Sequence, residues 1–159
     1  DLDQILSFVD ATGFFRPGEV EVAAEVLDDA LAGGSDGHYQ SYVAEMAGKP
    51  VGWVCFGPTP CTEGTYDIYW IVVDATVQSR GIGCRLMSHV ESLIRASMGR
   101  LIVLETSGSA RYERTCRFYL KAGYHEAARA ADFYGPGADK LVYIKRLDDL
   151  RPGTVALPL

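Results

Sequence analysis

Apolar residues recur with the spacing of an α-helix in four segments of the chain. Near the start, Leu2, Ile5, Leu6 and Val9 follow the i, i+3, i+4, i+7 pattern of one helix face. Three later segments keep the same period, and a glycine soon follows each of them, as is common after the last turn of a helix: residues 19–31, 81–98 and 111–122. The pattern therefore predicts four helices.

Six other segments have the residue types of β-strands. Residues 39–46 and 51–56 flank a Gly-Lys-Pro turn, which predicts a hairpin, and residues 66–73 form a longer run rich in aromatic and β-branched residues. Three shorter strands are predicted at residues 101–104, 126–129 and 141–145, the last two around a Gly-Pro-Gly turn. No repeat or linker divides the chain, so the order of elements predicts one mixed α/β domain over residues 1–159 with a central sheet.

Charge and composition narrow the possible functions. The chain has 15 Lys and Arg against 21 Asp and Glu, a net charge of −6. Because nucleic-acid-binding domains usually carry a basic excess, we expect no nucleic-acid partner. The longest apolar run is too short to cross a bilayer and no signal peptide opens the chain, so we expect a cytoplasmic protein without a membrane partner. The four cysteines lack metal-ligand spacing, so no metal site is expected.

The most informative segment joins the apolar strand 66–73 to the helix that begins near residue 81. It contains Gly81 and Gly83, with Gln78, Arg80 and Arg85 close by. A helix start presents unpaired N–H groups and the positive end of the helix dipole, and glycines let a phosphate approach the backbone closely. The segment has neither the lysine of a P-loop nor the third glycine of a dinucleotide fingerprint. It predicts a phosphate-binding turn of another kind, or a glycine-rich helix start without a ligand.

Two motifs, one in this turn and one further along the chain, resemble those of a known protein family. Residues 78–83, Gln-Ser-Arg-Gly-Ile-Gly, match the Q/R-x-x-G-x-G/A signature of the GCN5-related N-acetyltransferase (GNAT) superfamily, and residues 118–124 resemble the end of that family's last helix. The resemblance extends from about residue 3 to residue 147. It implies the GNAT fold, a mixed central sheet flanked by helices, in which the parallel strands 66–73 and 101–105 splay apart. The family usually begins with a strand, so we expect native sequence to be missing before Asp1.

The resemblance also implies acetyl-CoA as the cosubstrate. The backbone of residues 71–73 would pair with the pantetheine arm, and residues 78–84 would hold the pyrophosphate. Tyr112 occupies the position, seven residues before Tyr119, where the family often has an asparagine. The implied cofactor-binding residues are Ile71, Val72, Val73, Gln78, Ser79, Arg80, Gly81, Ile82, Gly83, Cys84 and Tyr112.

The chemistry implied is direct attack of a neutral amine on the thioester, which needs a base and an acid. Tyr119 lies where the family places the acid that protonates the departing thiolate. Two carboxylates match positions of acidic bases in different branches of the family, Asp67 in the strand before the turn and Glu105 at the end of the next strand. Bulk water is a third acceptor for the amine proton, and the choice among the three stays open.

The acceptor is expected to be a primary amine of a small molecule or peptide. In the regions that select GNAT substrates, this chain has Phe15 between Phe14 and Arg16, and further along Tyr66, Tyr69 and Tyr134. Aromatic faces and the acidic net charge suit a cationic amine, although the same aromatics would also suit an ordinary core. The alternative function is a non-catalytic acyl-CoA-binding module on the same fold. A homodimer is compatible with the family, but no residue stripe marks an interface.

Overall fold

The predicted helices and strands are all present in the structure of this protein, a computed structural model that describes residues 2–13, 15, 17–34 and 37–147. The helices are α1 (Leu2–Ala11), α2 (Pro17–Gly33), α3 (Ile82–Ala96) and α4 (Glu113–Lys121). The strands are β1 (Gln40–Met46), β2 (Lys49–Pro58), β3 (Thr65–Val73), β4 (Leu101–Ser107), β5 (His125–Gly135) and β6 (Ala138–Arg146). Two short 3-10 helices precede α3 and α4, η2 (Ala75–Val77) and η3 (Ala110–Tyr112).

The two last strands are longer than the sequence predicts. β5 continues to Gly135 and β6 begins at Ala138, because the two strands pair almost to the turn between them. Much of β5 is alanine, arginine and aspartate, which are not typical of strands, so its residue types gave little signal. Backbone pairing with β6 supplies the hydrogen bonds that define this strand.

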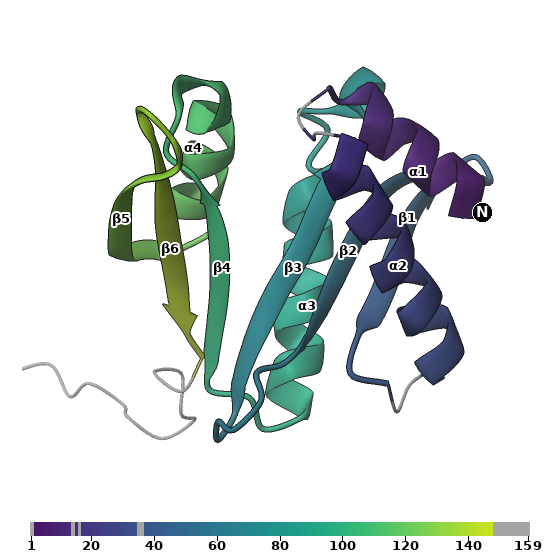
Figure 1. Cartoon of the computed structure of the whole chain (residues 1–159). Coiled ribbons are helices and arrows are strands. Elements are labelled where there is room, and N and C mark those ends of the chain that lie inside the picture. Colours follow the sequence, from purple (N-terminus) through teal and green to yellow (C-terminus); the bar gives the residue numbers. More distant parts are fainter. Residues whose placement is uncertain (1, 14, 16, 35–36, 148–159) are drawn as a thin grey trace, which may run out of the picture.

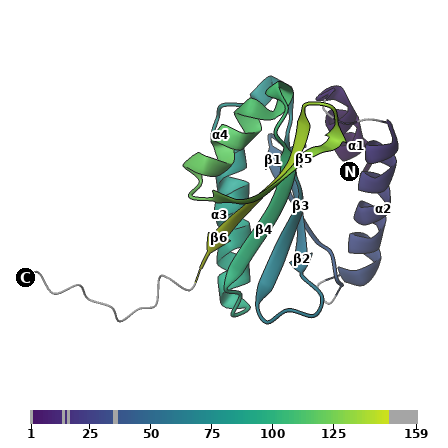
Figure 2. The same ribbon diagram turned by 60° about the vertical axis from the view of Figure 1, so that its left-hand side comes forward.

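The strands form one sheet of six in the order β1-β2-β3-β4-β6-β5. The pair β3 and β4 is parallel and the other pairs are antiparallel. Helices α1 and α2 cover one face of the sheet, and α3 and α4 cover the other (Figures 1 and 2). This is the mixed α/β arrangement that the sequence predicts.

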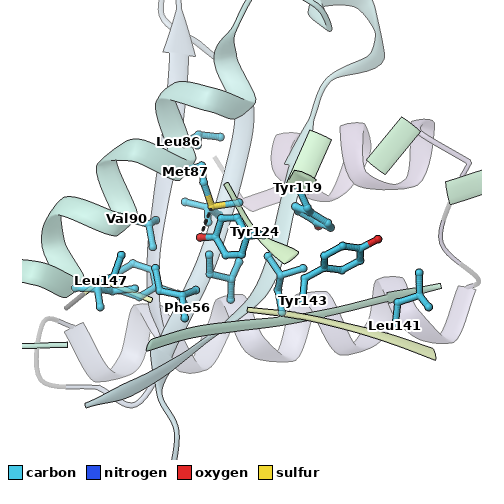
Figure 3. Packing of buried hydrophobic residues seen from close by; sticks show 14 residues of the cluster. Phe56, Leu86, Met87, Val90, Tyr119, Tyr124, Leu141, Tyr143 and Leu147 are labelled. Carbon is cyan, nitrogen blue, oxygen red and sulfur yellow. Dashed lines mark hydrogen bonds between the residues drawn. The ribbon is translucent and has the colours of Figure 1, made fainter. Parts of the chain in front are cut away.

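Each face of the sheet has its own core. On the α1 and α2 side, Val9, Trp53 and Val72 belong to one buried cluster. On the α3 and α4 side, aliphatic residues of α3 pack with the aromatic rings of Tyr124 and Tyr143 (Figure 3). The hydroxyl of Tyr124 donates to the sulfur of Met87 over 3.2 Å, so this buried phenol has a partner.

A β-bulge in β3 reverses the direction of its side chains. Cys55 of β2 pairs with Trp70, but the next residue, Phe56, pairs with Ile68, which leaves Tyr69 as the extra residue. Ile68 packs in the core on the α3 side, whereas Val72, four residues later, packs on the α1 side. In a regular strand these two side chains would share one face.

The same region of β3 parts from β4. The parallel ladder pairs residues 65–68 with residues 101–104 and then stops. Beyond that point the two strands diverge, as Figure 1 shows toward its upper edge. Within the described residues, the backbone of β3 from Tyr69 to Val73 has β2 on one side and no strand on the other.

Candidate functional site

The turn between β3 and α3 is held open by its own side chains. The Gln78 amide donates to the carbonyl of Val73 over 3.1 Å and fixes the loop against the end of the strand. Asp74 caps η2 by accepting from the backbone N–H of Thr76 at 2.8 Å. Gly81 then starts α3 with a φ of +79°, and no side chain caps this helix. The first N–H groups of α3 therefore face outward with no side-chain acceptor.

The two glycines of the turn serve different purposes. A Cβ at Gly83 would lie 3.3 Å from the ring of Phe118, so this glycine lets α4 lie close to α3. A Cβ at Gly81 would have no heavy atom within 4 Å. Glycine is therefore favoured at position 81 by the left-handed backbone conformation, while the space around a Cβ there is open.

Two cavities meet at the diverging edge of β3. One, the loop cavity, has a volume of about 630 Å³ and lies between the turn and α4, with Ser79, Gly81, Ile82, Gly83 and Cys84 in its wall. The other, the wedge cavity, has about 550 Å³ and lies between β3 and β4. Both are lined by Ile71, Val73, Gln78, Thr115 and Tyr119, so they adjoin one another.

The loop cavity is cationic. Arg114, Arg117 and Lys121, all from α4, line it, and its described lining contains no Asp or Glu. The guanidinium of Arg114 donates to the Ser79 hydroxyl over 2.7 Å and joins α4 to the turn. Sequence reasoning missed these three residues, although their i, i+3, i+7 spacing on a helix after the glycine turn was a usable signal.

Tyr119 lies where the two cavities meet. It is 6% exposed and its ring contacts those of Tyr143 and Tyr124, with centroids 5.8 Å and 6.3 Å away (Figure 3). Burial raises the pKa of the Tyr119 phenol well above its ordinary value of 10, with a smaller contribution from Cys116. The phenol therefore keeps its proton at physiological pH and is a weaker acid than an exposed tyrosine.

Of the two candidate bases, Glu105 is the one that the fold brings to the wedge cavity. It lies on β4, and its carboxylate pairs with the ammonium of Lys140 at 2.6 Å. Half of the Glu105 side chain is exposed, so an acceptor can reach it. Lys140 in turn lies 4.7 Å from the centre of the Phe133 ring. This pair fixes the carboxylate between β4 and the β5–β6 hairpin.

Asp67 is not brought to either cavity. Its carboxylate accepts a hydrogen bond from the Thr59 hydroxyl at 2.6 Å, and it precedes the bulge on β3. The bulge separates Asp67 from the part of β3 that lines the cavities. Its hydrogen bond ties β3 to the loop after β2.

Most of the aromatic residues expected at the acceptor site do line the wedge cavity. Phe15, Tyr69 and Tyr134 are in its wall, from the loop before α2, the bulge of β3 and the end of β5. Tyr66 instead packs against the core on the α3 side, near the other end of β3. Phe14 and Arg16 lie outside the described residues.

The expected cofactor residues divide between the two cavities. Val72 and Tyr112 line the wedge cavity, and the other expected residues line the loop cavity except Arg80, which is exposed and lines neither. In the described part of the chain, no group of three or more His, Cys, Asp or Glu side chains is arranged to hold a metal. None of the described helices is long and apolar enough to cross a membrane.

Comparison with known proteins shows the family to which this chain belongs. Residues 37–126 match the model of the acetyltransferase (GNAT) domain. A GNAT-family protein of known structure from Desulfovibrio desulfuricans is 40% identical, with a TM-score of 0.87 over 92% of each chain. A search of the curated proteins gave no match.

More distant structures share the fold. The aminoglycoside 6′-N-acetyltransferase from Enterococcus faecium is 18% identical, with a TM-score of 0.72 over 91% of this chain and 89% of that one. An aminoglycoside 6′-N-acetyltransferase crystallised with coenzyme A is 19% identical, with a TM-score of 0.70 over the same shares. The fold, the glycine turn and the paired cavities define an acetyl-transferring enzyme. The chain belongs to the GNAT acetyltransferase family, and it is an acetyl-CoA-dependent N-acetyltransferase.

Proposed function

We propose that this enzyme transfers the acetyl group of acetyl-CoA to the primary amine of a small cationic molecule or a short peptide. The observation that carries the proposal is the charge of the two adjoining cavities. The loop cavity has three cations and no carboxylate in its described lining, which suits a polyphosphate donor. The wall of the wedge cavity contains the carboxylates of Glu19 and Glu105 and one arginine, Arg111, and Glu105 also pairs with Lys140. Carboxylates set among aromatic rings suit a cationic acceptor.

The donor lies along β3 in this proposal. The N–H groups at the start of α3 and the guanidinium of Arg114 bind the pyrophosphate. The pantetheine arm pairs with the open backbone edge of residues 71–73, as an added strand would. This path leads from the loop cavity toward Tyr119, where both cavities meet.

The acceptor enters from the wedge cavity. Its cationic groups are attracted by Glu105 and Glu19 and by the faces of the aromatic residues in the wall. Neighbours of the same fold include aminoglycoside N-acetyltransferases, which act on small-molecule amines. That likeness supports a small-molecule acceptor, with a short peptide as the second class.

Two residues handle the protons of the reaction. Acetyl-CoA supplies a thioester carbonyl, and the neutral amine forms a C–N bond to it as the C–S bond breaks. Glu105, whose carboxylate is positioned by its contact with Lys140, receives the amine proton directly or through water. Tyr119, which borders both cavities, gives its proton to the sulfur as the C–S bond breaks, and a proton from water restores the phenol before the next turnover.

A pooled amine library tests the proposal. The pool holds amino acids, polyamines, aminoglycosides and short peptides, and mass spectrometry detects products after incubation with acetyl-CoA. We expect a mass increase of one acetyl group on a cationic amine and none with heat-denatured enzyme. Acetylation confined to neutral or acidic amines, or no product although acetyl-CoA binds, would overturn the acceptor class proposed.

A further inference from the structure

The hairpin of β5 and β6 contains a bulge that is larger than the one in β3. The ladder between the two strands is interrupted between Ala130 and Gly135. The four residues in between, 131–134, lie opposite a single residue of β6, Asp139. A common bulge places two residues opposite one. Residues 131–134, the hairpin bulge, therefore depend on bonds other than the regular ladder for their shape.

The carboxylate of Asp139 supplies such bonds. One oxygen accepts from the backbone N–H of Asp132 over 3.0 Å, and the other accepts from the guanidinium of Arg129 over 2.9 Å. Asp132 has a φ of 52°, and its own carboxylate accepts from the N–H of Gly137 over 2.7 Å. The bond from the Asp132 N–H, followed by that from Arg129, lowers the pKa of Asp139, so its carboxylate is charged at neutral pH. One side chain thus joins the bulge to both strands.

The hairpin bulge carries two aromatic side chains to the acceptor side of the site. Tyr134 lines the wedge cavity, and its ring packs edge-on against that of Phe133 with centroids 4.9 Å apart. Burial, followed by the charge of Glu105, raises the pKa of the Tyr134 phenol, so this phenol lies near the candidate base. Tyr134 is 42% exposed and Phe133 is 58% exposed. The core holds neither ring, so the bonds of the bulge set the position of this wall of the cavity.

The groups that handle protons lie outside the hairpin bulge. Glu105 is on β4 and Tyr119 is on α4, and Lys140, the partner of Glu105, belongs to the regular part of the ladder. The backbone carbonyl of Asp139 accepts from the N–H of Gly108 over 2.8 Å, a bond that does not use the side chain. Loss of the Asp139 carboxylate therefore releases the bulge and leaves the two strands and the proton-handling groups in place.

We propose, on the basis of the proposed function, that Asp139 is a positioning residue for the acceptor. Asp139 lines neither cavity, so it acts through the hairpin bulge, which holds Tyr134 in the wall where the acceptor binds. Acetyl-CoA follows β3 and the turn before α3 in the proposed function, away from the hairpin. Asp139 therefore affects the binding of the acceptor and not that of the donor.

Steady-state kinetics of Asp139→Ala test this role. The probe is the amine that the wild type acetylates fastest in the pool of amino acids, polyamines, aminoglycosides and short peptides. We expect the KM for that amine to rise about tenfold, with kcat and the affinity for acetyl-CoA within about twofold of wild type, because only the wall of the acceptor site is displaced. Asp139→Asn keeps an oxygen for the N–H of Asp132 but loses the charge, and should raise the KM by about threefold.

Glu126→Ala is the matched control. Glu126 also binds Arg129, at 2.9 and 3.0 Å, and its replacement removes the same charge, but it lies before the bulge. Its KM should match that of the wild type. Because these ion pairs are partly exposed, urea unfolding should show that each variant is folded. If Asp139→Ala does not fold, Asp139→Asn and Glu126→Gln give the same comparison.

Three results would overturn the positioning role while the proposed function stands. They are an unchanged KM in the folded Asp139 variants, an equal rise in the Glu126 control, and a loss of acetyl-CoA affinity as large as the rise in KM. If the wild type acetylates no amine of the pool, the proposed function fails, and this inference with it.

Discussion

At the scale of single residues, Tyr119 is both part of the core and part of the wall of the site. Its ring is packed among other aromatic residues, yet its position borders both cavities. Removal of the hydroxyl alone keeps the ring and its packing. A chemical role can therefore be tested without disturbing the core.

We expect Tyr119→Phe to lower kcat by about 100-fold, the lower end of what a general acid contributes. The affinity for acetyl-CoA should stay within about twofold of wild type, because the hydroxyl is not needed to hold the pyrophosphate. Steady-state kinetics and calorimetry give the two numbers. Tyr143→Phe is the matched control, because Tyr143 is also buried but lines neither cavity. Equal turnover in wild type and Tyr119→Phe would show that Tyr119 only packs.

At the scale of elements, the turn before α3 is the part that the sequence describes best. The glycine signature predicts a strand, a turn and a helix start in that order, and all three are present. The helix starts one residue after Gly81, whose positive φ only glycine adopts without strain. The local sequence is enough to predict this turn, because the glycine signature reflects the backbone conformation of the turn itself.

Substitution at this turn separates folding from binding. In Gly81→Asp the new side chain meets no heavy atom, and aspartate tolerates a positive φ better than most residues, so we expect the variant to fold. Its carboxylate would repel the pyrophosphate, and we expect acetyl-CoA affinity to fall by about tenfold or more. Gly81→Asn has nearly the same shape without the charge and should lose less. Unchanged affinity in a folded Gly81→Asp, measured by calorimetry, would remove the phosphate site from the turn.

Features set by long-range pairing were harder to predict. In the sequence, Asp67 and Glu105 are equal candidates for the base, and only the bulge at Tyr69 and the end of the β3–β4 ladder place them differently. Tyr66 and Tyr69 look alike in sequence, but the first packs on the core and the second lines the wedge cavity. Bulges and strand divergence depend on partners distant in sequence, which a local pattern does not contain.

Elements on opposite sides of the site are joined by a buried ion pair. Lys145 of β6 donates to both carboxylate oxygens of Glu91 on α3, each at 2.9 Å, and to the carbonyl of Ala122 after α4 at 2.7 Å. Glu91 is 7% exposed and also accepts from the hydroxyl of Tyr124. The helix with the phosphate turn and the helix with Tyr119 are thus fixed to one strand.

We expect Lys145→Met to lower the free energy of unfolding by about 3 kcal/mol, because the largely buried Glu91 carboxylate then has only the guanidinium of Arg95, 4.0 Å away and partly exposed. The double variant Glu91→Met/Lys145→Met should recover most of that loss, since no charge then remains buried. Urea unfolding of the two variants and the wild type gives the comparison. If the double variant loses as much free energy of unfolding as Lys145→Met, or more, the pair stabilises the fold by more than the neutralisation of a buried charge.

At the scale of the whole molecule, buried tyrosines make the stability of the fold depend on pH. Tyr119 and Tyr124 both lie in the core between the sheet and the helices α3 and α4 (Figure 3). Burial raises the pKa of each phenol above its ordinary value of 10, and the nearby Glu91 carboxylate raises that of Tyr124 further. Below pH 10 these phenols are protonated in both the folded and the unfolded chain, so their stabilising effect is complete.

Above pH 10 the unfolded chain loses these protons while the folded chain retains them, so the free energy of unfolding should fall as pH rises. The slope from each buried tyrosine approaches about 1.4 kcal/mol per pH unit once the unfolded phenol is fully ionised, and between pH 9 and 11 it averages about half of that. Tyr124→Phe should reduce the measured slope by about that amount. Tyr42→Phe removes the hydroxyl of a tyrosine that is 37% exposed and serves as the matched control. Urea unfolding at pH 9, 10 and 11 supplies the slopes, and identical slopes for wild type and Tyr124→Phe would contradict the link between burial and alkaline stability.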